Sequence, residues 1–311
     1  MKIVRAEKYG FCAGVRIADK KVKKFAAEGG RDGKILGQVV HNERVVEEME
    51  ELGVPTVDSL DAASEGTIVF SAHGVPPSFH RRAEERGLQI LDTTCPFVYD
   101  IHEEADKARQ EGAHLVFIGE SDHREVIGYT HDRDPSTYHV LTTVEEASKI
   151  DWEAYDSVKI LYQTTLNAEE YEDVARYIEA RSGGAERADT ICYATKENQD
   201  AARELAGDPE IDLVLVIGGR WSANTRHLWE ICRELKPSYL VHGASEIEAD
   251  WLEGVEAVGI TAGASTPDYM IDEVEERIVE LAGVDPASVE YVRPGERRPA
   301  GRRLAPAGSG G

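Results

Sequence analysis

The chain lacks the features that mark membrane, secreted and nucleic-acid-binding proteins. It has no apolar run of about 18 residues, so we expect no membrane span, and Met1 leads straight into a strand-like segment, so we expect no signal peptide. Its four cysteines are too few for a disulfide-stapled secreted fold and suggest a reducing, cytoplasmic setting. A net charge of −24 argues against a general nucleic-acid binder.

Two short motifs are also missing. No CxxC pair occurs, which excludes local zinc-knuckle and thioredoxin motifs. No GxxxxGK(S/T) loop occurs either, so a bound phosphate group would need other donors than those of a P-loop. The cysteines and the polar loop residues therefore have to be interpreted from their positions in the chain.

Three of the cysteines occupy equivalent positions. Cys12, Cys95 and Cys192 each follow a short strand-like run and precede a helix-like stretch, about one in each third of the chain. At a helix start the macrodipole and the free backbone N–H groups favour a thiolate. We therefore predict that these three residues form one cluster at the centre of three α/β units.

The fourth cysteine is different, because Cys232 shares one helical face with Leu228, Ile231 and Leu235 and is predicted to lie in the core. Three thiolates can hold a 4Fe–4S cluster in which one iron has no protein ligand. Zinc bound by three cysteines and one histidine is the competing interpretation. The spacing of the cysteines does not separate the two metals.

Strand-like and helix-like segments alternate along most of the chain, which predicts an α/β fold with mainly parallel sheets. The strand-like runs cover residues 2–5, 34–40, 66–71, 89–91, 114–119, 158–163, 188–191, 212–218, 238–241 and 257–262. From about Gly283 the pattern fades, and a segment rich in Arg, Pro and Gly follows. We expect that segment to be a loose tail.

Polar residues follow nearly every predicted strand. They include His41, Asn42, His73, His123, Glu125, Thr164, Ser222, Asn224 and Ser265. Open α/β sheets bind ligands beyond the carboxyl ends of their strands, and hydroxyls, histidines and backbone N–H groups there suit phosphate oxygens. Any one of these residues alone is more often an ordinary turn or cap residue. Their shared position favours a site for an anionic ligand.

Seven short blocks of the sequence occur together in a specific order. They are GFCAGV from residue 10, VVHN from 39, SAHGV from 71, TCP from 94, QTTL from 163, ICYAT from 191 and TAGAS from 261. With these blocks the chain resembles the LytB/IspH-type 4-hydroxy-3-methylbut-2-enyl diphosphate reductases. The resemblance runs from Met1 to about residue 282. It implies a trefoil of three α/β domains around a central iron–sulfur cluster. It also implies the last step of the methylerythritol phosphate route, in which an allylic diphosphate is reductively dehydroxylated to isopentenyl and dimethylallyl diphosphates.

The resemblance also assigns roles to individual residues. It makes Cys12, Cys95 and Cys192 the ligands of one 4Fe–4S cluster per chain with one open iron site. It makes Glu125 the proton donor, assisted by Thr164 and His123. The substrate-binding residues that it implies are His41, His73, His123, Thr164, Ser222, the backbone of Ala223, Asn224 and Ser265. A raised carboxyl pKa near a bound anion would let Glu125 hold its proton.

We expect three units and a tail. The first covers residues 1–95 with Cys12, His41 and His73, and the second covers 96–192 with Cys95 at its start and His123, Glu125 and Thr164. The third covers 193–282 with Ser222, Asn224 and Ser265, and the tail covers 283–311. The implied partners are a small prenyl diphosphate and a ferredoxin- or flavodoxin-type electron donor, with no nucleic acid and no membrane.

The sequence departs from the family pattern at two loops. Where the family usually has His-Pro-Glu after an upstream Gly-His, this chain has His123-Arg124-Glu125 after Gly119-Glu120. Where the family has Ser-Ser-Asn, Ala223 replaces the second serine. An alternative function from another class is a non-catalytic iron–sulfur or zinc protein that senses redox state or binds a phosphorylated metabolite. Glu125 and Thr164 separate the two, because proton delivery needs them and binding does not.

Overall fold

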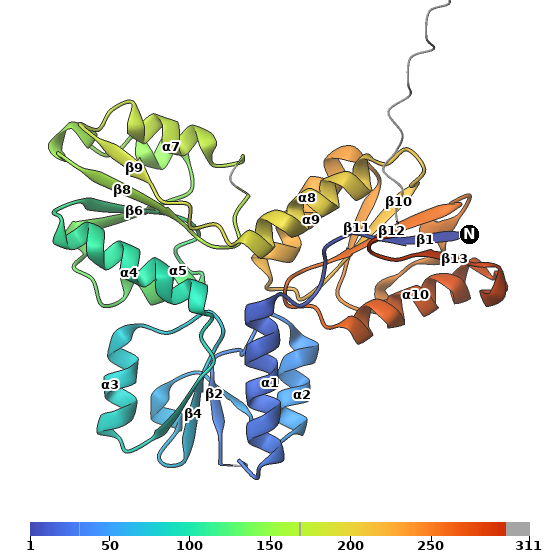
Figure 1. The fold of residues 1–311 in the computed structure, drawn as a ribbon, viewed down its shortest axis with the longest axis horizontal. Helices are drawn as coiled ribbons and strands as arrows, with labels where there is room; N and C mark the ends of the chain where they lie inside the picture. The colour runs from blue at the N-terminus through green and yellow to red at the C-terminus, as the bar shows by residue number, and fades with distance from the viewer. Residues whose placement is uncertain (31, 168, 297–311) are drawn as a thin grey trace, which may run out of the picture.

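The structure of the chain is a computed structural model that describes residues 1–30, 32–167 and 169–296. Within these ranges three parallel β-sheets each form the centre of one lobe, and Figure 1 shows the three lobes meeting at a common centre. Every strand pairing in the three sheets is parallel. The predicted α/β class with mainly parallel sheets is confirmed.

The first lobe contains a four-stranded sheet in the order β3–β2–β4–β5. Its elements are α1 (Ala13–Ala27), β2 (Lys34–Leu36), α2 (Glu43–Glu51), β3 (Thr56–Val57), β4 (Thr67–Phe70), α3 (Pro77–Glu85) and β5 (Gln89–Asp92). Val15, Ala18 and Val22 recur at helical spacing on α1, and they pack in one core cluster with Ile35 and Val69 of the sheet. This apolar stripe fixes α1 against the first sheet and thereby places the start of α1 at the centre of the molecule.

The second lobe contains a four-stranded sheet in the order β7–β6–β8–β9. Its elements are α4 (Pro96–Gln110), β6 (His114–Ile118), α5 (Arg124–Thr130), β7 (Tyr138–Leu141), α6 (Val144–Ala147), β8 (Val158–Tyr162), α7 (Glu172–Glu179) and β9 (Ala185–Arg187). Pro96 takes the first helical position of α4, where no intrahelical N–H bond is lost. Val98 and Ile101 of this helix pack with Leu115 and Phe117 of β6.

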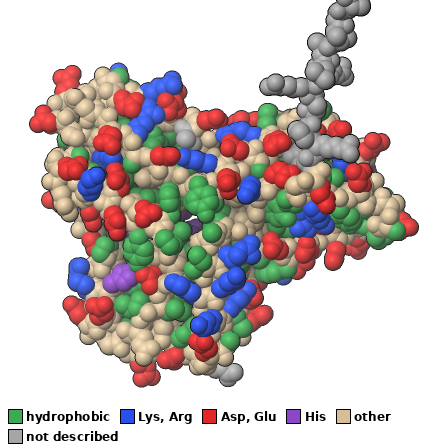
Figure 2. All heavy atoms as spheres, in the orientation of Figure 1, with side chains coloured by type: hydrophobic (Ala, Val, Ile, Leu, Met, Phe, Trp, Pro, Cys, Tyr) green, Lys and Arg blue, Asp and Glu red, His purple; other side chains and the backbone are tan. Residues whose placement is uncertain are grey.

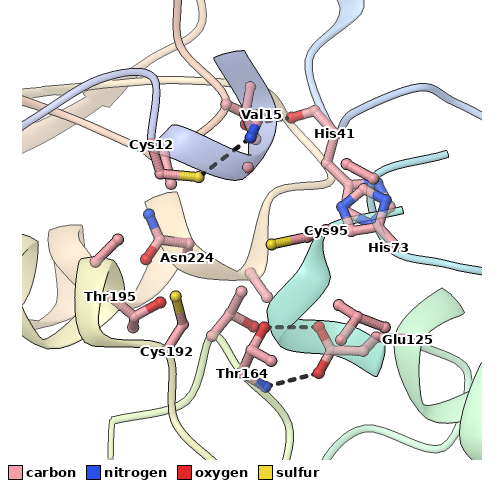
Figure 3. A pocket seen from close by; sticks show the side chains of 18 of the residues that line it. Cys12, Val15, His41, His73, Cys95, Glu125, Thr164, Cys192, Thr195 and Asn224 are labelled. Carbon is pink, nitrogen blue, oxygen red and sulfur yellow. Dashed lines mark hydrogen bonds between the residues drawn. The ribbon is translucent and has the colours of Figure 1, made fainter. Parts of the chain in front are cut away.

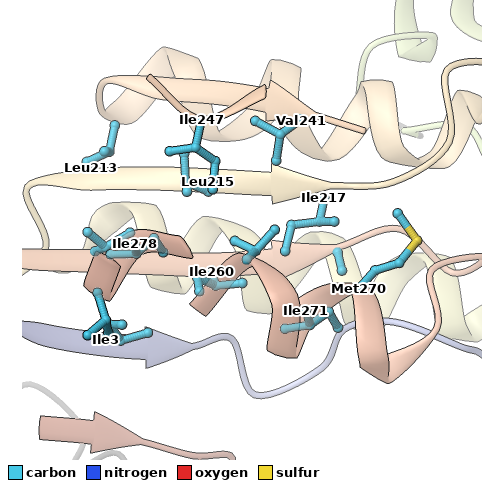
Figure 4. Packing of buried hydrophobic residues seen from close by; sticks show 14 of the residues in the cluster. Ile3, Leu213, Leu215, Ile217, Val241, Ile247, Ile260, Met270, Ile271 and Ile278 are labelled. Carbon is cyan, nitrogen blue, oxygen red and sulfur yellow. The ribbon is translucent and has the colours of Figure 1, made fainter. Parts of the chain in front are cut away.

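The third lobe contains a five-stranded sheet in the order β11–β10–β12–β1–β13. Its elements are β1 (Lys2–Arg5), α8 (Tyr193–Gly207), β10 (Leu213–Ile217), α9 (Ala223–Leu235), β11 (Ser238–Val241), β12 (Ala257–Ala262), α10 (Asp268–Ala282) and β13 (Glu290–Val292). Figure 4 shows Ile3 of β1 in the same apolar layer as Leu215 of β10, Ile260 of β12 and Ile278 of α10. Cys232 of α9 is fully buried in a neighbouring cluster, as its helical face predicts.

The first strand departs from the expected division of the chain. The sequence predicts residues 2–5 in the first unit, 1–95, but β1 pairs with β12 from Lys2↔Ala257 to Arg5↔Ile260 and therefore belongs to the third lobe. A run of four residues in which only Ile3 and Val4 are apolar fits any parallel sheet, and its partner is decided by the lobe that buries it. The local pattern of residues 2–5 carries no information on that choice.

Part of the expected loose tail also forms structure. β13 pairs with β1, so the predicted tail 283–311 contributes an edge strand to the third sheet. The guanidinium groups of Arg5 and Arg293 both bind the carboxylate of Glu275, which is 4% exposed, and this links β1, α10 and the segment after β13. Residues 297–311 of the predicted tail lie outside the described residues.

One predicted strand is wrong. Residues 188–191 are irregular, and the strand in this region is β9, just before them. Thr190 explains the difference, because its Oγ1 accepts the N–H of Tyr162 at 2.6 Å and donates to the carbonyl of the same residue at 2.9 Å. A side chain thus replaces the ladder bonds that a strand would make, and the chain is free to turn toward Cys192.

The surface agrees with the composition of the chain. Figure 2 shows acidic side chains spread over all three lobes of the face in view, in keeping with a net charge of −24. Among the helices of the described ranges, none is both long and apolar enough to span a membrane.

Candidate functional site

Three cysteines from distant segments meet at the centre of the molecule. Cys12 is the N-cap of α1, Cys95 of α4 and Cys192 of α8, so the predicted equivalence of their positions holds in space. Figure 3 shows their sulfurs around a common space. All three are free, half-buried thiols, and the Sγ of Cys12 accepts the N–H of Val15 at 3.4 Å. The structure brings the three together and keeps Cys232 apart.

The spacing of the three sulfurs can be compared with that of the ligands of a single ion. Zinc binds thiolates at about 2.3 Å, which puts the sulfurs of a tetrahedral site about 3.8 Å apart. Among the described residues, the one trio of His, Cys, Asp or Glu ligand atoms within 4.8 Å of one another is Glu170, His227 and Glu230. The three cysteine sulfurs therefore do not all lie within 4.8 Å of one another.

Burial opposes the ionisation of two of these thiols. The pKa values of Cys95 and Cys192 are raised above the ordinary value, chiefly by burial, while backbone N–H groups at the helix starts act in the opposite direction. We expected the helix starts to favour the thiolates, and for these two residues burial outweighs that effect. Metal ligands have to be deprotonated, so binding here would release protons.

Three histidines lie together beside the cysteines. The ring centroids of His41 and His73 are 4.0 Å apart, and that of His123 lies 5.3 Å from His41. Burial, with a smaller effect of His123 and Arg124, lowers the pKa of His41 to about 3, and burial also holds the pKa of His73 well below its ordinary value. His41 and His73 are therefore neutral at pH 7 and contribute hydrogen bonds rather than positive charge.

The ring nitrogens of these histidines have open hydrogen-bonding positions. Nδ1 of His123 accepts the backbone N–H of Glu125 at 3.3 Å, so Nε2 carries the proton when the ring is neutral. Nδ1 of His41 bonds to Oε1 of Gln38 at 3.2 Å. Nε2 of His41, Nε2 of His123 and Nδ1 of His73 are buried without a partner. Unsatisfied buried polar atoms are costly, which indicates that a polar ligand completes them.

The start of α9 faces the same space from the third lobe. Ser222 is the N-cap, and its Oγ accepts the N–H of Thr225 at 3.2 Å. Asn224 is 3% exposed, and both its Oδ1 and its Nδ2 lack a partner. The first backbone N–H groups of a helix, including that of Ala223, have no intrahelical acceptor. Ser265 donates its hydroxyl to the carbonyl of His41 at 2.9 Å and so joins the third lobe to the first.

The second lobe contributes a buried carboxyl group, that of Glu125, to the same cavity. Glu125 is the second residue of α5 and is 1% exposed. Thr164 binds both of its oxygens, since Oγ1 donates to Oε2 at 2.6 Å and the backbone N–H donates to Oε1 at 2.7 Å (Figure 3). A solvated surface acid, the ordinary state of a Glu in so acidic a chain, is therefore excluded for Glu125.

All twelve predicted site residues line one cavity of about 90 Å³ at the junction of the three lobes. The predicted residues are Cys12, Cys95, Cys192, His41, His73, His123, Glu125, Thr164, Ser222, Ala223, Asn224 and Ser265. Three thiols, neutral imidazoles, an amide, hydroxyls and one carboxyl thus converge, and no lysine or arginine lines the cavity within the described ranges. This set can hold a metal cluster next to an oxygen-rich ligand and can supply a proton.

Comparison with known proteins decides the family. The family described as LytB protein matches residues 3–279, which is most of the chain. The chain belongs to the LytB protein family. The membership predicted from the seven sequence blocks is thereby confirmed.

Relatives in the LytB family match over nearly their whole length. A 4-hydroxy-3-methylbut-2-enyl diphosphate reductase of Alkaliphilus oremlandii is 37% identical over 90% of this chain and 100% of the relative. The enzyme of the same name from Aeromonas hydrophila is 39% identical over 91% of this chain and 92% of the relative.

Solved structures agree with the sequence relatives. One, described as (E)-4-hydroxy-3-methyl-but-2-enyl diphosphate reductase, the terminal enzyme of the non-mevalonate pathway, is 35% identical with a TM-score of 0.66 and covers 90% of this chain and 99% of its own. The structure of E-1-hydroxy-2-methyl-but-2-enyl-4-diphosphate reductase from Plasmodium falciparum has a TM-score of 0.84 at 23% identity, over 96% of this chain and 93% of its own. At that identity the second likeness supports the fold alone.

The departures from the LytB pattern have visible structural counterparts. Arg124 lies over Gly37, where a Cβ atom would be 2.2 Å from its Nη1, so the arginine packs on bare backbone. Glu120 forms an ion pair with Arg226 of α9, which ties the second lobe to the third. Both residues lie at the rim, because Arg124 and Glu120 line an outer pocket that shares His41 and His123 with the cavity.

Sequence reasoning missed two hydroxyl residues that line the cavity of this LytB protein. Thr165 follows Thr164, and Thr195 is the third residue of α8 and 3% exposed. Both lie within the blocks that carried the resemblance, but a threonine next to a more conspicuous residue gives no separate signal. The rotation of α8 about its axis, which no local pattern specifies, turns Thr195 inward.

Proposed function

We propose that this chain is a 4-hydroxy-3-methylbut-2-enyl diphosphate reductase. The reaction breaks the allylic C–O bond, adds two electrons and two protons, and yields water with isopentenyl or dimethylallyl diphosphate. The observation that carries the proposal is the buried Glu125–Thr164 pair, which lies in one cavity with three cysteines and the unpartnered atoms of histidines and Asn224. The family and its reductase relatives support the same activity.

We infer that Cys12, Cys95 and Cys192 hold one 4Fe–4S cluster, around which the three lobes form a trefoil. Three thiols at three helix starts, whose sulfurs do not all lie within 4.8 Å of one another, fit such a cluster. When bound, it supplies electrons and a Lewis-acidic iron that has no cysteine ligand. The electrons come from a ferredoxin- or flavodoxin-type donor, and the free thiols suit a reducing cytoplasm.

The substrate's diphosphate fits the neutral side of the cavity. Nε2 of His123 is a buried donor without a partner, and Asn224 offers an unpartnered amide N–H. Ser222 can donate its hydroxyl hydrogen while its oxygen caps α9, and the helix start adds free backbone N–H groups. Binding by neutral donors explains how an anion is held where no lysine or arginine of the described chain lines the cavity.

Glu125 holds the proton for the leaving hydroxyl. Loss of hydroxide is unfavourable, so a positioned acid that turns the leaving group into water lowers the barrier. The hydroxyl of Thr164 bonds to Glu125 and lines the cavity, so it connects the carboxyl group with the bound substrate. Because Glu125 is 1% exposed, its carboxyl group is shielded from bulk water.

The alternative is a non-catalytic iron–sulfur protein that binds a phosphorylated metabolite or senses redox state. Such a protein needs the cysteines and the phosphate-binding groups, but it has no use for a carboxyl group buried on a threonine. The decisive experiment is anaerobic purification followed by reduction of the allylic diphosphate with an artificial electron donor. Binding of the diphosphate without turnover by brown, cluster-containing protein would favour the alternative, and colourless zinc protein would overturn the cluster.

Alanine in place of His41 or Asn224 is expected to weaken substrate binding about tenfold or more. Each change removes a buried polar group from the diphosphate side, and a hydrogen bond to a charged group contributes roughly 1.5–3 kcal/mol. Affinity would be measured by calorimetry on anaerobic protein. His131→Ala, at an exposed histidine of the second lobe, is the control. Unchanged affinity in both variants would show that the diphosphate does not bind next to His41 and Asn224.

Alanine in place of Gly14 is expected to lower the iron content. A Cβ atom at Gly14 would lie 2.6 Å from the Sγ and 3.2 Å from the Cβ of Cys95, so Cys95 has to move. The same change in an unobstructed helix stabilises it by about 1 kcal/mol. Gly207→Ala in α8, where no atom lies within 4 Å of the added Cβ, is the matched control and should keep its iron. Full iron in Gly14→Ala would show that Cys95 need not keep its position.

A further inference from the structure

Outside the cavity, one further group of side chains has the composition of a metal site. Glu170 lies between β8 and α7 in the second lobe, and His227 and Glu230 lie three residues apart on α9 in the third lobe. One potential ligand atom from each lies within 4.8 Å of the others. We propose that these three residues bind a divalent transition-metal ion, distinct from the group held by the cysteines.

The orientation of His227 is the first support. Its side chain is 2% exposed, and its Nδ1 lies 2.9 Å from the backbone carbonyl of Thr165. A carbonyl oxygen only accepts, so Nδ1 carries the hydrogen, and in the neutral ring Nε2 has the lone pair that a metal ion needs. Metal-binding histidines commonly donate their second nitrogen to a backbone carbonyl, which fixes the ring and strengthens the ligand. His227 is held in this way before any ion arrives.

The charge balance is the second support. Burial and the negative charges of Glu120, Glu170 and Glu230 all raise the pKa of the neighbouring Tyr171. Arg226 is the one cation among the described charged groups with the largest effects on this pKa. Arg226 pairs with Glu120 and lies 3.9 Å from Glu230, while no lysine or arginine of the described ranges pairs with Glu170. Two carboxylates near a buried imidazole repel each other unless a cation or a proton lies between them. A divalent ion supplies that charge.

The donor set indicates the class of ion. One imidazole and two carboxylates suit zinc, manganese or ferrous iron, whereas magnesium prefers oxygen ligands alone. Zinc binds nitrogen and carboxylate oxygen at about 2.0–2.2 Å, so side-chain rotation has to bring the three ligands slightly closer. Three protein ligands leave a fourth position for water.

An ion here would join two walls of the active site. His227 lies one turn after Asn224 on α9, and its hydrogen-bond partner Thr165 follows Thr164. Glu170 continues the same segment toward α7. The ion would therefore hold the Thr164 segment of the second lobe against the start of α9 in the third, and it is expected to raise the thermal midpoint of the protein.

The test uses cluster-containing protein, kept anaerobic, with Zn²⁺ as the probe. Equilibrium dialysis followed by elemental analysis gives zinc and iron in the same sample. The variants are His227→Asn, whose amide can still donate to Thr165, and Glu230→Gln, with Glu234→Gln on the exposed face of α9 as the control. We expect one zinc per chain in the parent and in Glu234→Gln. We expect at least about tenfold weaker binding in the other two variants.

Equal zinc binding in the parent, His227→Asn and Glu230→Gln would overturn the proposal, and so would no binding by the parent at millimolar Zn²⁺. Zinc uptake that accompanies loss of iron would place the ion at the cysteines instead. Magnesium binding as tight as zinc binding would contradict the class of ion. Since Glu230 is only half-buried, its glutamine variant decides the question even if His227→Asn fails to fold.

Discussion

Serine in place of Cys12, Cys95 or Cys192 is expected to remove most of the bound iron and sulfide, whereas serine in place of Cys232 leaves them in place. The first three cysteines line the cavity, and Cys232 packs in the core of the third lobe with no exposed surface. Burial raises the pKa of Cys232 to about 12, which disfavours the thiolate that a metal requires. With one of the three ligands lost, only two cysteines would hold the cluster, so it would be bound less tightly.

The measurement is iron and sulfide per chain after anaerobic purification, together with visible absorbance. Cys232→Ser also reports on folding, since it places a hydroxyl in an apolar cluster and is expected to lower the thermal midpoint without changing the iron content. The assignment is wrong if Cys232→Ser loses the cluster while a serine variant of Cys12, Cys95 or Cys192 retains it.

Glutamine in place of Glu125 is expected to lower kcat by about 10²–10⁴-fold while substrate affinity and iron content change little. Glutamine keeps the size of the side chain and can still accept the Thr164 N–H at Oε1, but it cannot release a proton. The effect therefore falls on the chemical step rather than on binding. Anaerobic turnover, substrate affinity and iron content would be measured on the same preparation.

Thr164→Val is the companion variant, because it removes the hydroxyl that bonds to Glu125 and preserves the backbone N–H bond. A fall in kcat that is smaller than that of Glu125→Gln is expected. Near-normal turnover of Glu125→Gln would mean that the proton reaches the substrate from elsewhere, and loss of iron in this variant would make Glu125 a structural residue.

That the site residues line one cavity could be predicted, because most of them lie in short sequence blocks that resemble those of a known family. Cys12, Cys95 and Cys192 stand at helix starts in the sequence and in space, and Cys232 follows the apolar period of α9. The state of the groups could not be predicted. The neutral form of His41 depends on burial and on charges from a second lobe, and the hydrogen bonding of Glu125 depends on Thr164, which lies in the turn after β8.

The fold was predictable as a class and less so in its connections. Alternation of strand and helix gives parallel sheets, but it does not say which sheet a short strand joins, as β1 shows. Thr190 illustrates a second limit, because one hydroxyl bound to the backbone of Tyr162 converts an apparent strand into an irregular segment. The trio of Glu170, His227 and Glu230 is a third example, since two lobes contribute to it and the sequence separates its members widely.

The position of β1 between β12 and β13 has a consequence for how the chain acquires its structure. Lys2 pairs with Ala257 and with Glu290, so β1 leaves the ribosome long before the strands with which it pairs. Pairing over such a sequence separation is slow, and unpaired strand edges are exposed to aggregation in the interval. The first and second sheets contain only strands from 34–92 and 114–187, so they can form during translation. We therefore expect the third lobe to close last and to place Cys192 and Asn224 only then.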